Sequence, residues 1–493
     1  MNTDILINVD RAETRIAVIE DNRLVELLIE RVGQDRMVGD IHIGSVQAVV
    51  QGMQAAFVDI GIEKAGFLHV SDHRDAYVHS YTDEPYRSRR MYPIEQVLTE
   101  NRDLMVQVVK EPFGSKGVRL TTFISIPGKY CVLVPEETTV GISRKITDPD
   151  ERMRLKDLAS SLVPEGYGLI VRTMAEGISQ RDLAEDISYL LTLWKDITAR
   201  LQGRRGPYRM YRAMSLELAV VRDLFGTHVD RLITDSKSLY RNILKQLNGY
   251  SRSLRDRVEV YEDELPLFEY YDIESDIDDL FNHSVRLPNG GSITIEQTEA
   301  LVVIDVNTAG YAGGQNQEDT VFRTNIEAVD EIARQLRLRD LGGIIVVDFI
   351  DMLLPEHRGT VFERLVSAVK RDRANTRILP ISEFGLVEMT RERIRPSLLD
   401  TLLSECPRCG GSGAVVSLLS SAISLQRRLR AMEIRGISGS SLEIMADLIQ
   451  FLEEEWSDRW RIMRRQLKDI RIAEDHSHMP PWGFLIHEGV SMF

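Results

Sequence analysis

The 493-residue chain has few of the features that mark membrane, secreted and disulfide-stabilised proteins. No apolar run reaches the roughly 20 residues that a membrane span requires. Residues 1–10 lack the basic and apolar regions of a signal peptide. Three cysteines exclude a disulfide scaffold and predict a cytoplasmic, reducing environment. Hydrophobic content of 43% and charged content of 28% fit a folded protein of several domains.

Two common enzyme signatures are absent as well. The glycine-rich stretch Gly310–Gly314 lacks the lysine of a phosphate-binding GK[ST] loop, and no Ser-His-Asp or Cys-His arrangement stands out. The formal net charge of −15 argues against a general electrostatic nucleic-acid binder. Six arginines between Arg371 and Arg395 nevertheless cluster locally, either as a phosphate-binding patch or as a solvated face with salt bridges.

The most informative feature that is present is a pair of apolar strands ending in carboxylates. The first strand, 301–307, carries Asp305, and the second, 343–351, carries Asp348. Residues 319–340 between them contain no Gly or Pro and repeat apolar residues at helical spacing. A strand–helix–strand unit makes its two strands parallel. We therefore expect Asp305 and Asp348 to lie side by side at the carboxyl ends of the strands, where open α/β sheets bind ligands.

The donor atoms at this edge favour a hard metal ion. Asp305 and Asn307 share one face of their strand because side chains alternate, whereas Asp351 points elsewhere unless its strand has already ended. Two carboxylates and an amide suit Mg²⁺ or Mn²⁺ better than Zn²⁺. The pattern predicts a metal-dependent phosphodiesterase. The alternative is that one aspartate caps a loop and the other is simply exposed.

Residues 38–123 read as an all-β domain. Short strands separated by glycine turns predict a small Greek-key barrel of the oligonucleotide-binding type. These strands are expected at 41–50, 55–59, 66–70, 104–109 and 118–126, with an acidic, tyrosine-containing insert at 73–100. Residues 52–70 resemble an S1 RNA-binding domain, which implies that Phe57 and Phe67 stack on bases and that Lys116 contacts the RNA backbone. The alternative places both phenylalanines in the core.

The pair Cys406 and Cys409 has the CxxC spacing of a half zinc site. Structural zinc needs four ligands, and Cys131, distant in a strand-like segment, reads as a small hydrophobe. Two copies of the motif across a twofold axis complete a four-sulfur site, so the spacing favours a homodimer. A redox role is the alternative. Elsewhere the sequence predicts helices at 148–162, 180–202, 414–429 and 441–468, and a strand at 168–172.

Several ordered motifs together resemble the ribonuclease E/G family. They lie at 305–307, 324–328, 334–343, 348–352, 384–391 and 406–409, and the likeness runs from the first residues to about Gly413. The length is closest to the G type. The resemblance implies an endoribonuclease that cuts single-stranded, A/U-rich RNA, prefers a 5′-monophosphate end, and acts in ribosomal RNA maturation and messenger RNA decay.

The resemblance also implies the cofactors and the assembly. Asp305 and Asp348 would hold magnesium as catalytic residues, with Asn307 orienting them, while Cys406 and Cys409 would share zinc between two chains whose dimers associate into a tetramer. The fold class implied is multidomain α/β and β. Its domains are a ribonuclease H-like domain at 1–37 and 216–282 with two insertions, an S1 domain at 38–123 and a 5′-sensor at 124–215, then a DNase I-like catalytic domain at 283–400, a zinc link at 401–413 and a small C-terminal domain at 414–493.

The family's 5′-sensor transfers residue by residue. Arg172 would grip the terminal phosphate with a two-pronged hydrogen bond, Thr173 would add its hydroxyl, and Gly128 and Val132 would line the terminal nucleotide. Without the resemblance, Arg172 reads as a surface salt bridge. One departure is Asn375, which stands where ribonuclease E has a bracing arginine.

Two other classes of function remain open from the residues. A non-enzymatic RNA-binding scaffold would bind RNA without turnover and without magnesium. A DNA nuclease fits the predicted metal site equally well, and only the S1-like segment and the family resemblance favour RNA.

Overall fold

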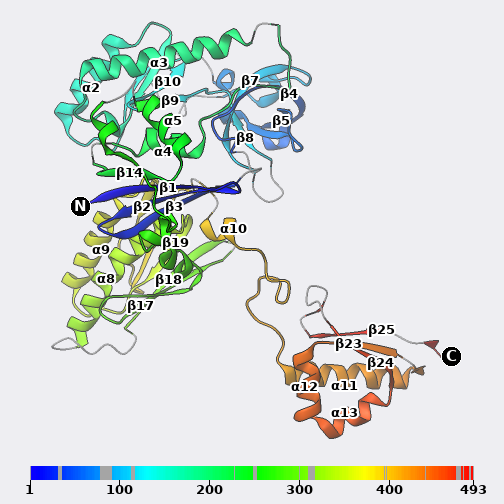
Figure 1. Ribbon diagram of the computed structural model, residues 1–493. Helices are drawn as coiled ribbons and strands as arrows, with labels where there is room; N and C mark the ends of the chain where they lie inside the picture. The colour runs from blue at the N-terminus through cyan, green and yellow to red at the C-terminus, as the bar shows by residue number, and fades with distance from the viewer. Residues whose placement is uncertain are drawn as a thin grey trace. The chain divides into compact units, whose positions relative to one another are not determined.

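The computed structural model divides into two compact units, unit 1 at Met1–Thr401 and unit 2 at Leu402–Phe493 (Figure 1). It describes all residues except 1, 32–35, 78–90, 113–116, 202, 227, 248–251, 299, 309–316, 394, 396, 439, 474–478, 481, 488–489 and 492–493. Among the described helices, none has both the length and the apolarity to span a membrane.

The first sheet of unit 1 joins two distant stretches of the chain. Its strand order is β15-β14-β1-β2-β3, with β1 antiparallel to β2 and parallel to β14. The strands are β1 (Thr3–Val9), β2 (Glu13–Glu20), β3 (Arg23–Arg31), β14 (Arg231–Thr234) and β15 (Val258–Val260). Helices α4 (Leu216–Asp223) and α5 (Lys237–Leu247) pack against it. Everything between β3 and α4 is therefore inserted into this sheet.

The first insertion is a closed barrel. Its strands follow the order β4-β5-β6-β8-β7, and pairing of β4 with β7 closes the ring. The bounds are β4 (Ile41–Val50), β5 (Ala55–Asp59), β6 (Gly66–His69), β7 (Asp103–Lys110) and β8 (Arg119–Thr121). The predicted five-stranded barrel of the oligonucleotide-binding type is confirmed, although the stretch 118–126 divides between β8 and a separate strand, β9 (Ile126–Pro127), of the next sheet.

The second insertion is a four-stranded sheet with two helices. Its order is β11-β12-β10-β9, with β10 (Cys131–Pro135), β11 (Val140–Ile142) and β12 (Tyr167–Val171). Helices α2 (Pro149–Leu162) and α3 (Gln180–Ala199) lie where periodicity predicts them, and the Asp148 and Ser179 side chains cap their first turns. Strand β13 (Tyr208–Tyr211) returns the chain to β4.

The last part of unit 1 contains the predicted strand–helix–strand unit. The sheet order is β16-β17-β18-β19-β21-β20, and β18 is parallel to β19. The strands are β16 (Ser284–Arg286), β17 (Ser292–Gln297), β18 (Leu301–Asn307), β19 (Gly343–Asp348), β20 (Thr376–Ile378) and β21 (Leu386–Arg391). Helix α8 (Gln317–Leu338) connects β18 to β19, and α9 (Pro355–Val369) follows.

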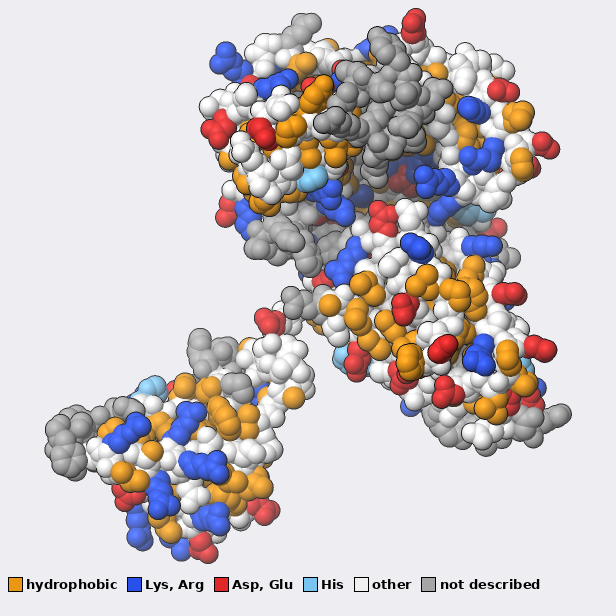
Figure 2. All heavy atoms as spheres, turned by 180° about the vertical axis from the view of Figure 1, so that it is seen from behind, with side chains coloured by type: hydrophobic (Ala, Val, Ile, Leu, Met, Phe, Trp, Pro, Cys, Tyr) orange, Lys and Arg blue, Asp and Glu red, His pale blue; other side chains and the backbone are white. Residues whose placement is uncertain are grey.

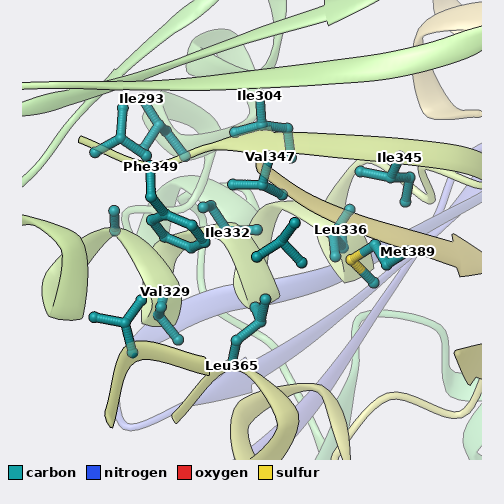
Figure 3. Packing of buried hydrophobic residues seen from close by; sticks show 14 of the residues in the cluster. Ile293, Ile304, Val329, Ile332, Leu336, Ile345, Val347, Phe349, Leu365 and Met389 are labelled. Atoms are coloured by element: carbon teal, nitrogen blue, oxygen red, sulfur yellow. The ribbon is translucent and has the colours of Figure 1, made fainter. Parts of the chain in front are cut away.

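Both helices cover the same face of this sheet. Figure 3 shows α8 side chains such as Val329 and Ile332 packed between the strand residues Ile304 and Val347 and the α9 residue Leu365. Alternate residues of β18 are buried, so Val302, Ile304 and Val306 enter the core while 301, 303 and 305 face away from the helices. The opposite face of the sheet therefore carries Asp305.

Unit 2 is a small α/β unit with its own core. It contains α11 (Leu418–Ile434), α12 (Ala446–Glu454) and α13 (Ser457–Arg464) beside a sheet of β24 (Leu467–Ile472), β23 (Ser440–Ile444) and β25 (Phe484–His487). The helix predicted at 441–468 is confirmed for α12 and α13, but it is wrong at both ends: its first residues belong to β23, which pairs with β24 and β25, and its last two begin β24. Sheet pairing prevails over helix propensity there.

The described chain also contains short helices and strands, namely α1 (Ile94–Val97), α6 (Leu267–Tyr270), α7 (Glu274–Asp278), α10 (Leu398–Leu402), β22 (Ile437–Ser438) and β26 (Val490–Ser491).

Figure 2 shows several Lys and Arg side chains on one face of unit 2 and hydrophobic side chains on the part of unit 1 that holds α8 and α9. The formal net charge of −15 thus does not describe every surface of the chain.

Candidate functional site: a carboxylate pair on the open face of a sheet

Asp305 and Asp348 lie opposite one another across two parallel strands. The register of β18 and β19 pairs Leu301 with Ile344 at one end and Asp305 with Asp348 at the other. Neighbouring strands are about 4.8 Å apart, and paired residues project to the same face. The predicted convergence of the two aspartates is confirmed, and both lie on the face that the helices leave uncovered. Asp348 is exposed and Asp305 is half-buried, so neither side chain is part of the hydrophobic core.

A concentration of negative charge marks this edge. Partial burial, followed by the charges of Asp305 and Asp351, raises the pKa of Asp348 above its usual value. Strand β19 ends at Asp348, so the chain turns and Asp351 comes close despite its odd spacing. The Asn307 amide donates from Nδ2 to Asp305 Oδ2 at 2.7 Å, a hydrogen bond that restricts the orientation of that carboxylate. A divalent cation would relieve the mutual repulsion of these carboxylates.

Asn325 braces the loop that follows Asp348. This fully buried residue of α8 donates from Nδ2 to Ile350 O at 2.9 Å and accepts at Oδ1 from Ile350 N at 3.1 Å. Sequence reasoning missed its role. The signal was a polar residue on the apolar face of an amphipathic helix, where an unpaired amide is costly.

The donor set fits magnesium better than a softer metal. Asp305, Asp348 and the amide Asn307 supply only oxygen ligands. The described residues contain no group of three or more His, Cys, Asp or Glu side chains arranged to hold a metal ion. A two-carboxylate site leaves most positions of a magnesium ion to water and substrate oxygens, as is common for this ion.

The arginine cluster lies away from the carboxylates. Strand β21 is antiparallel to β19, so Leu386 stands opposite Asp348 while Arg391 stands opposite Gly343, at the far end. The buried Arg391 guanidinium donates to Asp372 and Asp340, and Arg373 pairs with Glu26. These two arginines therefore form salt bridges within the fold, although Arg391 is buried and does not lie on a solvated face.

The two phenylalanines of the barrel form an outer aromatic surface. Phe57 and Phe67 are cross-strand partners on β5 and β6, with ring centroids 6.0 Å apart, and both are half-buried rather than part of the barrel core. His69 lies beside Phe67 at 6.5 Å with nearly parallel rings, a contact that sequence reasoning missed. Lys116 lies outside the described residues. The surface offers flat rings of the kind on which unstacked bases lie.

The predicted 5′-sensor residues come together around β10 and β12. Arg172 Nη1 donates to Gly128 O at 2.6 Å and to Asp223 Oδ1 at 2.7 Å. A Cβ on Gly128 would stand 2.6 Å from the Asp186 carboxylate oxygens, so this position requires glycine. Val132 pairs with Ile170 in the same sheet. The Nε–Nη2 edge of Arg172 takes part in neither contact, so it is the edge that a phosphate would meet.

One lysine joins the segment after β11 to the loop between α9 and β20. Thr173 Oγ1 lies 3.1 Å from Ser143 Oγ, and two residues further Lys145 Nζ donates to the carbonyls of Asp372 and Arg373 at 2.9 and 3.0 Å. Sequence reasoning missed this contact, since the partners are more than 200 positions apart. Asn375, at the family's bracing position, instead donates to Glu392 Oε2 at 2.6 Å.

The two cysteines of the CxxC lie on one turn of unit 2. Gly410 N donates to Cys406 O at 2.9 Å, and Arg408 pairs with Asp447 of α12, which holds the turn. Hydrogen bonds from the Cys409 and Arg408 backbone, and then from the Cys409 thiol, lower the pKa of Cys406. Cys131 is buried in unit 1, where its thiol donates to Asp186. Cys406, which is exposed, and Cys409, which is half-buried, are therefore the two accessible thiols.

Fold and site together define a multidomain α/β protein that combines an oligonucleotide-binding-type barrel with a carboxylate pair at the carboxyl ends of two central strands of a sheet. A model of the Ribonuclease E/G family matches residues 125–394. Ribonuclease G of Salmonella typhimurium (strain SL1344) is 41% identical over 429 residues, 87% of this chain and 88% of that protein. Ribonuclease E of Escherichia coli (strain K12) is 39% identical over 437 residues, 88% of this chain and 40% of that protein. The chain belongs to the ribonuclease E/G family.

Proposed function

We propose that this protein is a cytoplasmic, magnesium-dependent endoribonuclease that hydrolyses phosphodiester bonds in single-stranded, A/U-rich RNA. The observation that carries the proposal is the matched register of Asp305 and Asp348 on an uncovered sheet face. Its relatives are named ribonuclease G and ribonuclease E. Roles in ribosomal RNA maturation and messenger RNA decay belong to the same proposal.

Four residues beside β18 and β19 have separate roles in the proposed reaction. Asp305 and Asp348 would hold the magnesium ion, Asn307 orients the Asp305 carboxylate, and Asn325 keeps the loop after Asp348 in place. Bound magnesium would polarise the scissile phosphate and lower the pKa of a water. Attack of that water on phosphorus breaks the P–O3′ bond and leaves a 3′-hydroxyl and a 5′-phosphate.

Two further surfaces would position the substrate. Phe57 and Phe67 stack on unpaired bases, with Lys116 contacting the RNA backbone. At the other surface, Arg172 and Thr173 recognise a 5′-monophosphate, beside Gly128 and Val132, and a phosphate there competes with Asp223 for Arg172. Because of this competition, the preference for monophosphate ends depends on how strongly Asp223 holds Arg172, whereas cleavage itself does not.

The assembly proposed is a homodimer linked by zinc. Cys406 and Cys409 of one chain supply two thiolates, and a second copy supplies the other two of a four-sulfur site. Association of two such dimers gives a tetramer. Zinc holds the chains together and takes no part in hydrolysis.

The decisive experiment compares Asp305→Asn and Asp348→Asn with wild type on a 5′-monophosphorylated fluorescent RNA and on DNA of the same sequence. Both substitutions keep the side-chain shape and remove one charge, so cleavage is expected to fall at least 100-fold while the fold is retained. The control is Asp330→Asn, an exposed carboxylate on α8 that pairs with Arg364. Electron paramagnetic resonance of bound Mn²⁺ reports metal affinity without cleavage. Full cleavage or unchanged Mn²⁺ binding by either variant would remove the metal assignment, and equal cutting of DNA would remove the RNA preference.

A further inference from the structure

The two most exposed large hydrophobic side chains among the described residues flank the carboxylate edge. Phe384 is 85% exposed and Leu353 is 80% exposed. Isolated exposed apolar residues are ordinary on protein surfaces. These two, however, both belong to loops that adjoin Asp351, the residue whose charge acts on Asp348.

Phe384 stands in a turn that is held against Asp351. Gly385 N donates to Ser382 O at 3.1 Å, and Ser382 N donates to Leu386 O at 2.8 Å. Gly385 has a φ of +80°, and a Cβ there would lie 3.2 Å from Asp351 Oδ1. Leu386 pairs with Asp348 in the ladder. Phe384 is thus two residues from Leu386, the strand partner of Asp348. The hydrogen bonds of the turn fix its backbone, and the Phe384 side chain remains exposed.

Leu353 stands two residues after Asp351, in a loop that is anchored to α8 at both ends. Ile350 is held by Asn325, while Leu353 N and Leu354 N donate to the Glu318 carboxylate at 3.0 and 3.2 Å. The fixed backbone keeps the Leu353 side chain in solvent. Two apolar side chains therefore project beside the paired carboxylates from two independently braced loops.

We propose that Phe384 is a stacking platform for the base of one nucleotide beside the scissile phosphate, and that Leu353 contacts the neighbouring base. This inference rests on the proposed ribonuclease function. A phosphate bound there through the proposed magnesium ion would place its two flanking nucleotides beside the loops that carry Phe384 and Leu353. Unpaired RNA bases stack on aromatic faces with little dependence on base identity. The pair would hold the scissile linkage in line, a positioning role separate from that of Phe57 and Phe67 on the barrel.

The test uses an RNA with 2-aminopurine on either side of the mapped cleavage site and a hydrolysis-resistant phosphate analogue at that site, bound to the full-length protein with magnesium so that binding is read without cleavage. Wild type is expected to quench the fluorescence at one flanking position. Phe384→Ala should lose that quench and weaken binding by roughly 5- to 150-fold, the usual range for loss of one stacked base. Phe384→Tyr should restore both, and Leu353→Ala should show a smaller loss. The control is Met153→Ala, an exposed apolar residue of α2.

Cleavage kinetics with magnesium separate this inference from the proposed function. For Phe384→Ala, a raised KM with Asp305-dependent cleavage retained supports stacking. Unchanged quench and KM in Phe384→Ala would overturn it, even if Asp305→Asn abolishes cleavage. Reduced self-association of Phe384→Ala with an unchanged quench would also overturn it, since the side chain would then contact a second copy. A Phe384-dependent quench together with cleavage that Asp305→Asn leaves unchanged would support the stacking surface and remove the metal assignment of the proposed function.

Discussion

Replacing Arg391 with methionine should destabilise the sheet that carries the carboxylate pair. The Arg391 guanidinium is buried at the end of β21 and donates to Asp372 Oδ2 at 2.6 Å, Asp340 Oδ1 at 2.8 Å and Leu341 O at 2.8 Å. Methionine fills a similar volume without any donor. Asp372, itself buried, would then lose the guanidinium that pairs with its carboxylate.

The expected loss of stability follows from breaking the buried ion pair between Arg391 and Asp372. Removing one partner of a buried ion pair costs about 3–5 kcal/mol, far more than the pair contributes relative to apolar residues. Arg371→Met is the control, because Arg371 is exposed and surface substitutions of this kind change stability by about 0.5 kcal/mol or less. Adding Asp372→Asn to Arg391→Met should recover part of the loss, since asparagine keeps an acceptor for Ala374 N without the charge.

Hydrogen–deuterium exchange of peptides from β19 and β21 measures this local stability directly. A loss of about 3–5 kcal/mol corresponds to exchange that is roughly 100- to 5,000-fold faster. The alternative role of Arg391, binding RNA phosphates, predicts weaker RNA binding with unchanged exchange. Protection equal to that of Arg371→Met would refute the structural role of the Arg391 ion pairs.

Three further outcomes are expected. Burial lowers the pKa of His73 to about 4, so between about pH 6.5 and pH 4 the unfolded chain binds a proton at His73 that the folded chain does not. The free energy of unfolding should therefore fall by up to about 3 kcal/mol from pH 6.5 towards pH 4. In His73→Asn, the thermal midpoint should depend less on pH over this range. Arg172→Ala should narrow the rate difference between 5′-monophosphate and 5′-hydroxyl RNA, whereas Asp223→Asn should preserve or widen it; equal effects of both would contradict sensing by Arg172. Cys406→Ser should lower both zinc content and the sedimenting mass, and an unchanged oligomer without zinc would defeat the shared site.

Local patterns are sufficient for the strand–helix–strand unit. The apolar spacing of α8 and the apolar runs of β18 and β19 predict the elements, and the crossover rule then makes the strands parallel. The pairing of Asp305 with Asp348 follows from those two steps. The proximity of Asp351 does not, because it depends on where β19 ends and how the chain turns, which no spacing rule states.

Other features cannot be read from sequence neighbours. Six arginines close together in the chain suggest one patch, but the antiparallel return of β21 carries Arg391 to the opposite end of the sheet from Asp348. Lys145 contacts carbonyls more than 200 positions away. The residues of β23 are predicted to be helical, yet pairing with β24 and β25 stabilises an extended conformation that they only weakly prefer by themselves.

The amino-acid order alone predicted the strand–helix–strand unit of β18, α8 and β19, a barrel of five short strands, and the meeting of Asp305 and Asp348. These follow from periodicity and handedness, which act within short stretches of chain. Only the tertiary structure decided that Arg391 is paired internally, that Arg172 already has a carboxylate partner, and that Phe384 stands in solvent beside Asp351. Partners and exposure depend on residues far apart in the chain, so they exist only once the fold has formed.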